Sequence, residues 1–203
     1  MNFLAHSLLG FDDSALIAGQ FCGDFVRGRD LSRFPEQVAR GIRLHRYLDV
    51  YTDNNPELLS ARREMKGVPG RFTGIIVDVL FDHYLATHWN TYSNLTLSVH
   101  AGNVQRSLQE HEGVFPHSLK MFMRALEKHA ILENNVHLSS IELTLRRLSR
   151  RSTKFAALAV PESQLIPWRD LLEDHFEKFY PSLEHAAMTH LSKNPASGHQ
   201  LLG

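Results

Sequence analysis

The chain has 203 residues, 43% of them hydrophobic, which is enough for one well-buried core and too few for two ordinary domains. Its formal charge is zero, which excludes the overall basic field of a nucleic-acid-binding protein. The single cysteine, Cys22, excludes an internal disulfide framework and suits a reducing compartment, and no stretch approaches the roughly 18 consecutive apolar residues of a membrane span. We therefore expect one cytoplasmic domain over residues 1–192, not bound to a membrane, and a disordered tail at 193–203.

Helical periodicity dominates the sequence and predicts an all-α, single-domain helical bundle. A short first helix is expected over residues 3–9, and residues 12–14 (Asp-Asp-Ser) offer an N-cap for a second helix that ends near Gly28. On this second helix Asp24 continues an apolar stripe that begins at Ile17. An acid therefore stands where a hydrophobic residue would be expected.

A third helix is predicted from Pro35 to about Thr52. At 100° per residue, His45 and Asp49 fall inside its apolar arc, one turn apart, the spacing at which two side chains can share a ligand. The alternative is that the histidine is simply hydrogen-bonded in the core.

The central helix is expected over Phe72–Trp89 and is apolar nearly all round, which indicates burial at the centre of the domain. Asp78 and Asp82 nevertheless lie one turn apart within it, with His83 beside them. A buried carboxylate is costly unless it is paired or bound to a metal. These acids therefore predict an ion site, with pairing to buried arginines as the alternative.

Four features are expected in the C-terminal half: a short helix over Leu97–Gln109, a helix opened by Pro116, a helix with a capping box at Ser139 and Glu142, and a long helix over Leu165–Leu191 with a break or kink at Pro181. Between Leu143 and Pro161 there is no acid, and the arginines from Arg146 onward form a basic run. Such a run is either a solvated face or a docking surface for an acidic partner.

Seven acids and histidines thus occupy apolar faces or their edges on four helices: His6, Asp24, His45, Asp49, Asp78, Asp82 and His83. A set of carboxylates and imidazoles without cysteine favours Mn²⁺, Mg²⁺ or Fe²⁺ over structural zinc. We expect His6, Asp24, His45, Asp78 and Asp82 as metal ligands, and Asp24, Asp49 and His83 as catalytic groups. An ion in such a site lowers the pKa of water, which suits hydrolysis, while arginines hold phosphoryl oxygens.

Several segments together resemble the acyl carrier protein phosphodiesterase family: NFLAH at 2–6, GDFVRG at 23–28, GIRLHRYLD at 41–49, TDNNP at 52–56, DVLFDHYLATHW at 78–89, SRR at 149–151 and FEKFYP at 176–181. The resemblance implies an all-helical enzyme distantly related to the HD-domain phosphohydrolases. It also implies a divalent cation, typically manganese, and removal of 4′-phosphopantetheine from holo-acyl carrier protein. The family's functional positions match the same seven acids and histidines. Two departures are Ser7, where leucine is expected, and the order of Asp82 and His83, which reverses the HD pair.

The partner implied by the resemblance is a small acidic helical protein. Basic residues suit its recognition by electrostatic complementarity. The candidates are Arg27, Arg29, Arg33, Arg40 and Arg43, or the run Arg146–Lys154, and we expect Arg27, Arg46, Arg150 and Arg151 to bind the substrate. Two other functions stay open: a phosphohydrolase of the same fold that acts on a nucleotide, and a non-catalytic protein that binds the carrier or stores metal.

Overall fold

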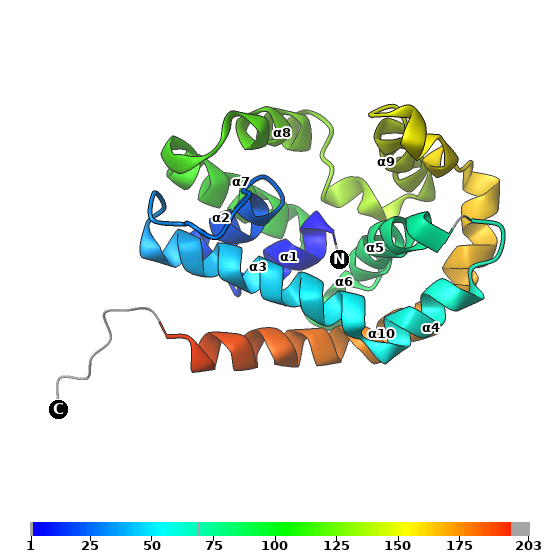
Figure 1. Ribbon diagram of the computed structural model, residues 1–203, viewed down its shortest axis with the longest axis horizontal. Helices are drawn as coiled ribbons and strands as arrows, with labels where there is room; N and C mark the ends of the chain where they lie inside the picture. The colour runs from blue at the N-terminus through cyan, green and yellow to red at the C-terminus, as the bar shows by residue number, and fades with distance from the viewer. Residues whose placement is uncertain (1, 69, 196–203) are drawn as a thin grey trace.

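The computed structural model describes residues 2–68 and 70–195, and this part of the chain contains helices and loops but no strand (Figure 1). The α-helices are α1 (Phe3–Leu8), α2 (Ser14–Gly23), α3 (Glu36–Asn54), α4 (Pro56–Glu64), α5 (Gly70–Thr87), α6 (Trp89–Tyr92), α7 (Leu97–His111), α8 (His117–Lys128), α9 (Leu138–Ser149) and α10 (Glu162–Lys193). Three short 3₁₀ helices lie at Glu112–Val114, Glu133–Val136 and Thr153–Leu158. The predicted all-α fold is confirmed. No helix of the described residues combines the length and the apolar character needed to cross a membrane.

The central helix α5 is buried on most of its circumference, as predicted. Ile76, Leu80 and Phe81 are fully buried, and the Phe81 ring meets Phe176 of α10 edge to face with centroids 5.4 Å apart. Figure 1 shows α8 and α9 at the top of the view and α3 and α10 at the bottom, with α1 and α5 between them. The core therefore surrounds α5, and the acids of this helix are held at the centre of the molecule.

Helices α2 and α3 cross at very close range. A Cβ added at Gly19 would lie 2.2 Å from the carbonyl oxygen of Val38, and one added at Gly41 would lie 2.5 Å from that of Leu16. Only glycine allows two backbones to approach so closely. This crossing brings the end of α2, and with it Asp24, against the middle of α3.

Some predicted boundaries are wrong. Helix α2 ends at Gly23 rather than near Gly28, because Gly28 has a φ of 83° and belongs to the loop before α3. Helix α4 was not predicted, although Asn55 caps it by accepting the N–H of Glu57 at 2.9 Å, with proline at its first position.

The C-terminal half differs from its prediction in two places. Helix α9 begins at Leu138 without a side-chain cap, so the capping box is wrong; the carboxylate of Glu142 instead accepts the N–H of Glu162 at 3.0 Å. Helix α10 runs without a break through Pro167 and Pro181, because buried residues on both sides of each proline anchor it to the core. The predicted break is therefore wrong, although the helix does bend: Figure 1 shows its gold first part descending at the right and its orange to red second part running along the bottom. It ends at Lys193, close to the predicted end at Leu191, and residues 196–203 of the predicted tail lie outside the described residues.

Candidate active site

Three of the predicted residues form a compact cluster. His6 of α1 with His45 and Asp49 of α3 offer one ligand atom each within 4.8 Å of one another. The Asp49 carboxylate lies 3.4 Å from His6 Nε2 and 3.2 Å from His45 Nε2, and the two rings stack with centroids 4.1 Å apart. Both histidines are buried, whereas the Asp49 side chain is 45% exposed. The cluster therefore opens to solvent on its carboxylate side.

Asp24 joins the cluster from the end of α2. Its carboxylate is 3.6 Å from His45 Nε2 and its side chain is 50% exposed. Gly23 lies directly against the His45 ring, since a Cβ there would stand 2.1 Å from the ring's Cδ2. The glycine thus allows the end of α2 to reach the imidazole.

The orientation of His6 is fixed by Gln20 of α2. His6 Nδ1 lies 2.9 Å from the Gln20 side-chain oxygen, and both side chains are buried. An amide oxygen only accepts hydrogen bonds, so Nδ1 carries the proton and Nε2 presents its lone pair. That lone pair faces the carboxylate of Asp49.

Charge is unevenly distributed over the cluster. Burial and the nearby His45 lower the pKa of His6. Burial alone would also lower the pKa of His45, but Asp24 and Asp49 raise it to about 9. Burial would raise the pKa of each carboxyl, but the adjacent imidazoles, His45 above all, outweigh it, so the pKa values of Asp24 and Asp49 are both lowered. The carboxylates are therefore ionised and His6 is neutral near pH 7.

These residues fit a divalent cation. The Nε2 of His6 is buried and makes no hydrogen bond, and it faces a carboxylate oxygen 3.4 Å away. A lone pair opposite a carboxylate is unfavourable unless a cation lies between them. Imidazole and carboxylate ligands suit a hard to intermediate metal ion such as manganese, although the donor set does not distinguish among such ions.

The structure places Asp82 away from this cluster, although it was expected as a ligand. Asp82 is fully buried and its two oxygens accept the N–H groups of Leu4 at 2.8 Å and Ala5 at 3.1 Å. Burial raises its pKa to about 7, against these two hydrogen bonds. Asp82 therefore anchors the start of α1, and through it the position of His6.

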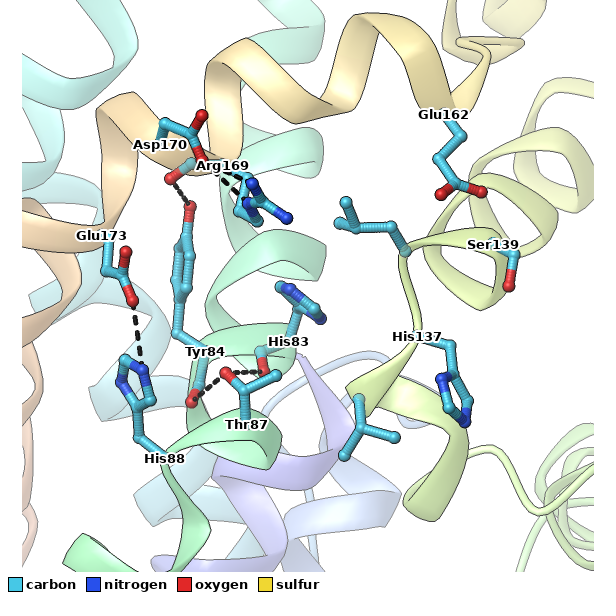
Figure 2. A pocket seen from close by; sticks show the side chains of 12 residues that line it. His83, Tyr84, Thr87, His88, His137, Ser139, Glu162, Arg169, Asp170 and Glu173 are labelled. Carbon is cyan, nitrogen blue, oxygen red and sulfur yellow. Dashed lines mark hydrogen bonds and ion pairs between the residues drawn. The ribbon is translucent and has the colours of Figure 1, made fainter.

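His83 also does not reach the cluster. It lines a separate cavity of about 540 Å³, called here the histidine cavity, which is lined by His83, His88, His137, Glu162, Arg169 and Glu173 among others. Figure 2 shows His83 entering this cavity from α5 and His137 from the segment before α9. His83 Nδ1 donates to the carbonyl oxygen of Asn135 at 2.7 Å, and burial lowers its pKa.

Asp78 and Asp24 line a second cavity, of about 350 Å³, between α1, α5, α8 and α9. Arg147 and Arg151 line the same cavity, which is called here the arginine cavity. Because Asp24 belongs both to this cavity and to the histidine–carboxylate cluster, the two adjoin. Any substrate in the arginine cavity thus lies next to the cluster.

The four predicted substrate-binding arginines fall in different places. Arg151 lines the arginine cavity, whereas Arg27 and Arg150 are exposed and do not line it. Arg46 donates from Nη2 to the carbonyl oxygen of Val26 at 2.9 Å, which ties α3 to the loop after α2. Arg147, which was named only as part of the basic run Arg146–Lys154, lines the same cavity from the last turn of α9, and Arg151 lines it from just beyond the end of that helix.

A family model described as acyl carrier protein phosphodiesterase matches residues 1–183. The chain belongs to this family. Among its relatives are acyl carrier protein phosphodiesterases of Yersinia pestis, 35% identical over 185 residues, and of Salmonella agona, 32% identical over 187 residues. Each alignment covers 90% of this chain and 95% of the relative. No solved structure matches the chain, so the predicted likeness of its fold to HD-domain phosphohydrolases stays a prediction.

Two residues of the candidate site, Gln20 and Gly23, were not singled out from the sequence. Neither residue departs from the pattern of its helix, because a glutamine is common on a helix face and a glycine is common at a helix end. The only available signal was the spacing of Gln20 and Asp24, which lie one turn apart on the same face.

Proposed function

We propose that this protein hydrolyses the phosphodiester bond of holo-acyl carrier protein and releases apo-carrier and 4′-phosphopantetheine. The observation that carries the proposal is the cluster of His6, His45 and Asp49, joined through Asp24 to a cavity lined by two arginines. Membership of the acyl carrier protein phosphodiesterase family supports the same reaction.

His6, His45 and Asp49 would hold the divalent cation, with Asp24 as a further candidate. A divalent cation there supplies positive charge that acidifies water and offsets charge developing on the phosphoryl oxygens. Manganese is our proposal for its identity, on the strength of the ligand types and the family resemblance. Gln20 keeps the His6 ring in the tautomer that a ligand requires.

Asp24 is the group best placed to orient the attacking water. It is ionised, half exposed and shared by the cluster and the arginine cavity. In the proposed reaction a water oxygen forms a bond to phosphorus, the bond from phosphorus to the carrier's serine oxygen breaks, and that oxygen takes up a proton. Arg147 and Arg151 can hold the non-bridging oxygens, because the planar guanidinium matches a phosphate.

Arg27, Arg150 and Lys154 are exposed and face no carboxylate within ion-pair distance among the described residues. They suit the acidic surface of a carrier protein. Two other basic residues proposed for docking are engaged: Arg40 donates to the carbonyl oxygens of Leu191 and Asn194 at 2.8 Å, and Arg43 pairs with Glu36.

The test is the intact mass of purified holo-acyl carrier protein after incubation with the protein, with Mn²⁺ and with chelator in parallel. Loss of the phosphopantetheine mass only in the presence of metal is expected. An unchanged carrier mass with metal-loaded protein would refute the proposal. The double variant Arg27→Glu, Arg150→Glu should raise the KM for holo-carrier at low salt, with little effect at high salt.

A further inference from the structure

The arginine cavity is larger and more apolar than hydrolysis at the cluster alone would require. Most of its wall is apolar and comes from four helices and the segment after α8; the apolar residues are Phe3, Ile75, Val79, Phe122, Ala125, Ile131 and Leu148. Its volume of about 350 Å³ lies within the range of roughly 300–1,000 Å³ typical of small-molecule sites. A phosphate group alone would not need an apolar chamber of this size.

The polar groups of the cavity are of two kinds. Asn2, Asn135 and Thr144 are neutral and can exchange hydrogen bonds with amides or hydroxyls. The charged groups are the carboxylates of Asp24, which is shared with the histidine–carboxylate cluster, and Asp78, and the guanidinium groups of Arg147 on α9 and Arg151 just after it. The lining therefore combines apolar surface, neutral hydrogen-bonding groups and arginines beside the candidate cation.

We infer that the arginine cavity binds the pantetheine arm of the substrate. This arm is a flexible chain with a branched apolar segment, a hydroxyl and two amides, and its phosphate is the group attacked. The apolar wall suits the branched segment, the neutral side chains suit the amides, and Asp24 places the phosphate end next to the cluster. The inference rests on the proposed function, because it assigns the position of that reaction's substrate.

The histidine cavity is a poorer fit for such an arm, although it is larger. Four of its ionisable groups pair with one another: His88 with Glu173 at 3.1 Å, and Arg169 with Asp170 at 2.7 Å. A largely uncharged chain placed there would remove water from charged groups without replacing their hydrogen bonds. It also adjoins none of His6, His45 and Asp49.

The experiment blocks each cavity with one large side chain and measures binding of free 4′-phosphopantetheine by calorimetry. Ala125→Trp fills the arginine cavity from α8, at a position that is not fully buried. Ser139→Trp fills the histidine cavity from α9, and Ser118→Trp adds the same side chain at an exposed position of α8 that lines neither. Thr144→Phe enters the arginine cavity from α9 and replaces Ala125→Trp if that variant does not fold.

The Mn²⁺-loaded wild-type protein should bind 4′-phosphopantetheine more tightly than inorganic phosphate. Ala125→Trp should weaken that binding by at least about tenfold and raise the KM for holo-carrier, while leaving phosphate binding unchanged. Ser139→Trp and Ser118→Trp should match wild type. The inference is overturned if wild type binds phosphopantetheine no better than phosphate, if Ala125→Trp binds it like wild type, or if Ser139→Trp is the variant that loses it.

The same experiment separates the inference from the proposed function. If wild type cleaves holo-carrier and Ala125→Trp neither weakens binding nor raises KM, only the position of the arm is wrong. If wild type leaves holo-carrier intact while binding of phosphopantetheine depends on Ala125, the reaction is wrong and the cavity assignment stands.

Discussion

Gly23 offers the sharpest test of how the cluster is held. A Cβ at this position would lie 2.1 Å from Cδ2 and 2.7 Å from Cβ of His45. Non-bonded carbons settle at about 3.5–4.0 Å, so Gly23→Ala must displace the imidazole by on the order of 1.5 Å. Because the clash includes the Cβ of His45, rotating the ring in place does not relieve it.

A displacement of this size is large for a metal ligand, whose bond lengths are fixed to within about 0.2 Å. We expect Gly23→Ala to weaken Mn²⁺ binding by about 10–100-fold, or about 1.4–2.7 kcal/mol, and to lower turnover in parallel. The measurement is calorimetric titration of the metal-free protein with Mn²⁺, with circular dichroism to confirm the fold.

Gly102→Ala is the matched control, since a Cβ at Gly102 has no neighbour within 4 Å and the residue lies inside α7. It should bind Mn²⁺ like wild type and be slightly more stable. An unchanged Kd for Gly23→Ala would show either that His45 is not a ligand or that its position is not set by the end of α2.

Two further predictions concern buried polar pairs. Gln20→Leu should weaken Mn²⁺ binding by about 10–100-fold, because it removes the acceptor that fixes the His6 tautomer. Gln20→Glu keeps an acceptor and should retain most of the affinity for Mn²⁺ when both variants are titrated by calorimetry. Burial lowers the pKa of His100, whose Nε2 lies 2.8 Å from Ser7 Oγ, to about 4. Between pH 6.5 and 4 the unfolded state then binds more protons than the folded state, so the free energy of unfolding should fall as the pH falls. His100→Gln should remove up to about 3 kcal/mol of this loss, as measured by urea denaturation at pH 7 and pH 4.5. An unaltered pH dependence of stability in this variant would refute the role of His100.

The sequence predicted the helices well because most of them are amphipathic, and an amphipathic helix shows which face it buries. On α3 the apolar arc is distinct, and His45 and Asp49, which interrupt it, both reach the cluster. On α2, Asp24 was found by the same reasoning. The end of that helix was misplaced, because Gly23 rather than Gly28 terminates it.

The same reasoning could not predict the surroundings of the polar side chains on the central helix α5. It is apolar nearly all round, so its pattern does not indicate which neighbour each side chain meets. Successive residues point 100° apart, and His83 consequently faces the histidine cavity while the adjacent Asp82 faces α1. Only the packing of α1 and α9 against α5 decides between these environments, and no local pattern contains that information.

Loss of activity alone would not show which acids bind the ion. Asp82 holds the two N–H groups at the start of α1, the helix that carries His6, so removing it should disturb the cluster indirectly. Asp82→Ala leaves two buried donors without an acceptor and should lower the free energy of unfolding of the metal-free protein by about 2–4 kcal/mol.

Metal-linked stabilisation separates the two roles. A ligand bound only by the folded state adds about 2.7 kcal/mol of stability when its concentration is 100 times its Kd. Asp82→Ala should lower the metal-free Tm yet still gain stability from Mn²⁺, because it keeps His6, His45 and Asp49. Asp49→Asn, which removes a carboxylate from the cluster itself, should lose most of the gain. If instead Asp82→Ala abolishes the Mn²⁺-induced rise in Tm while its metal-free Tm is unchanged, Asp82 is a ligand and its bonds to α1 are replaced when the ion binds.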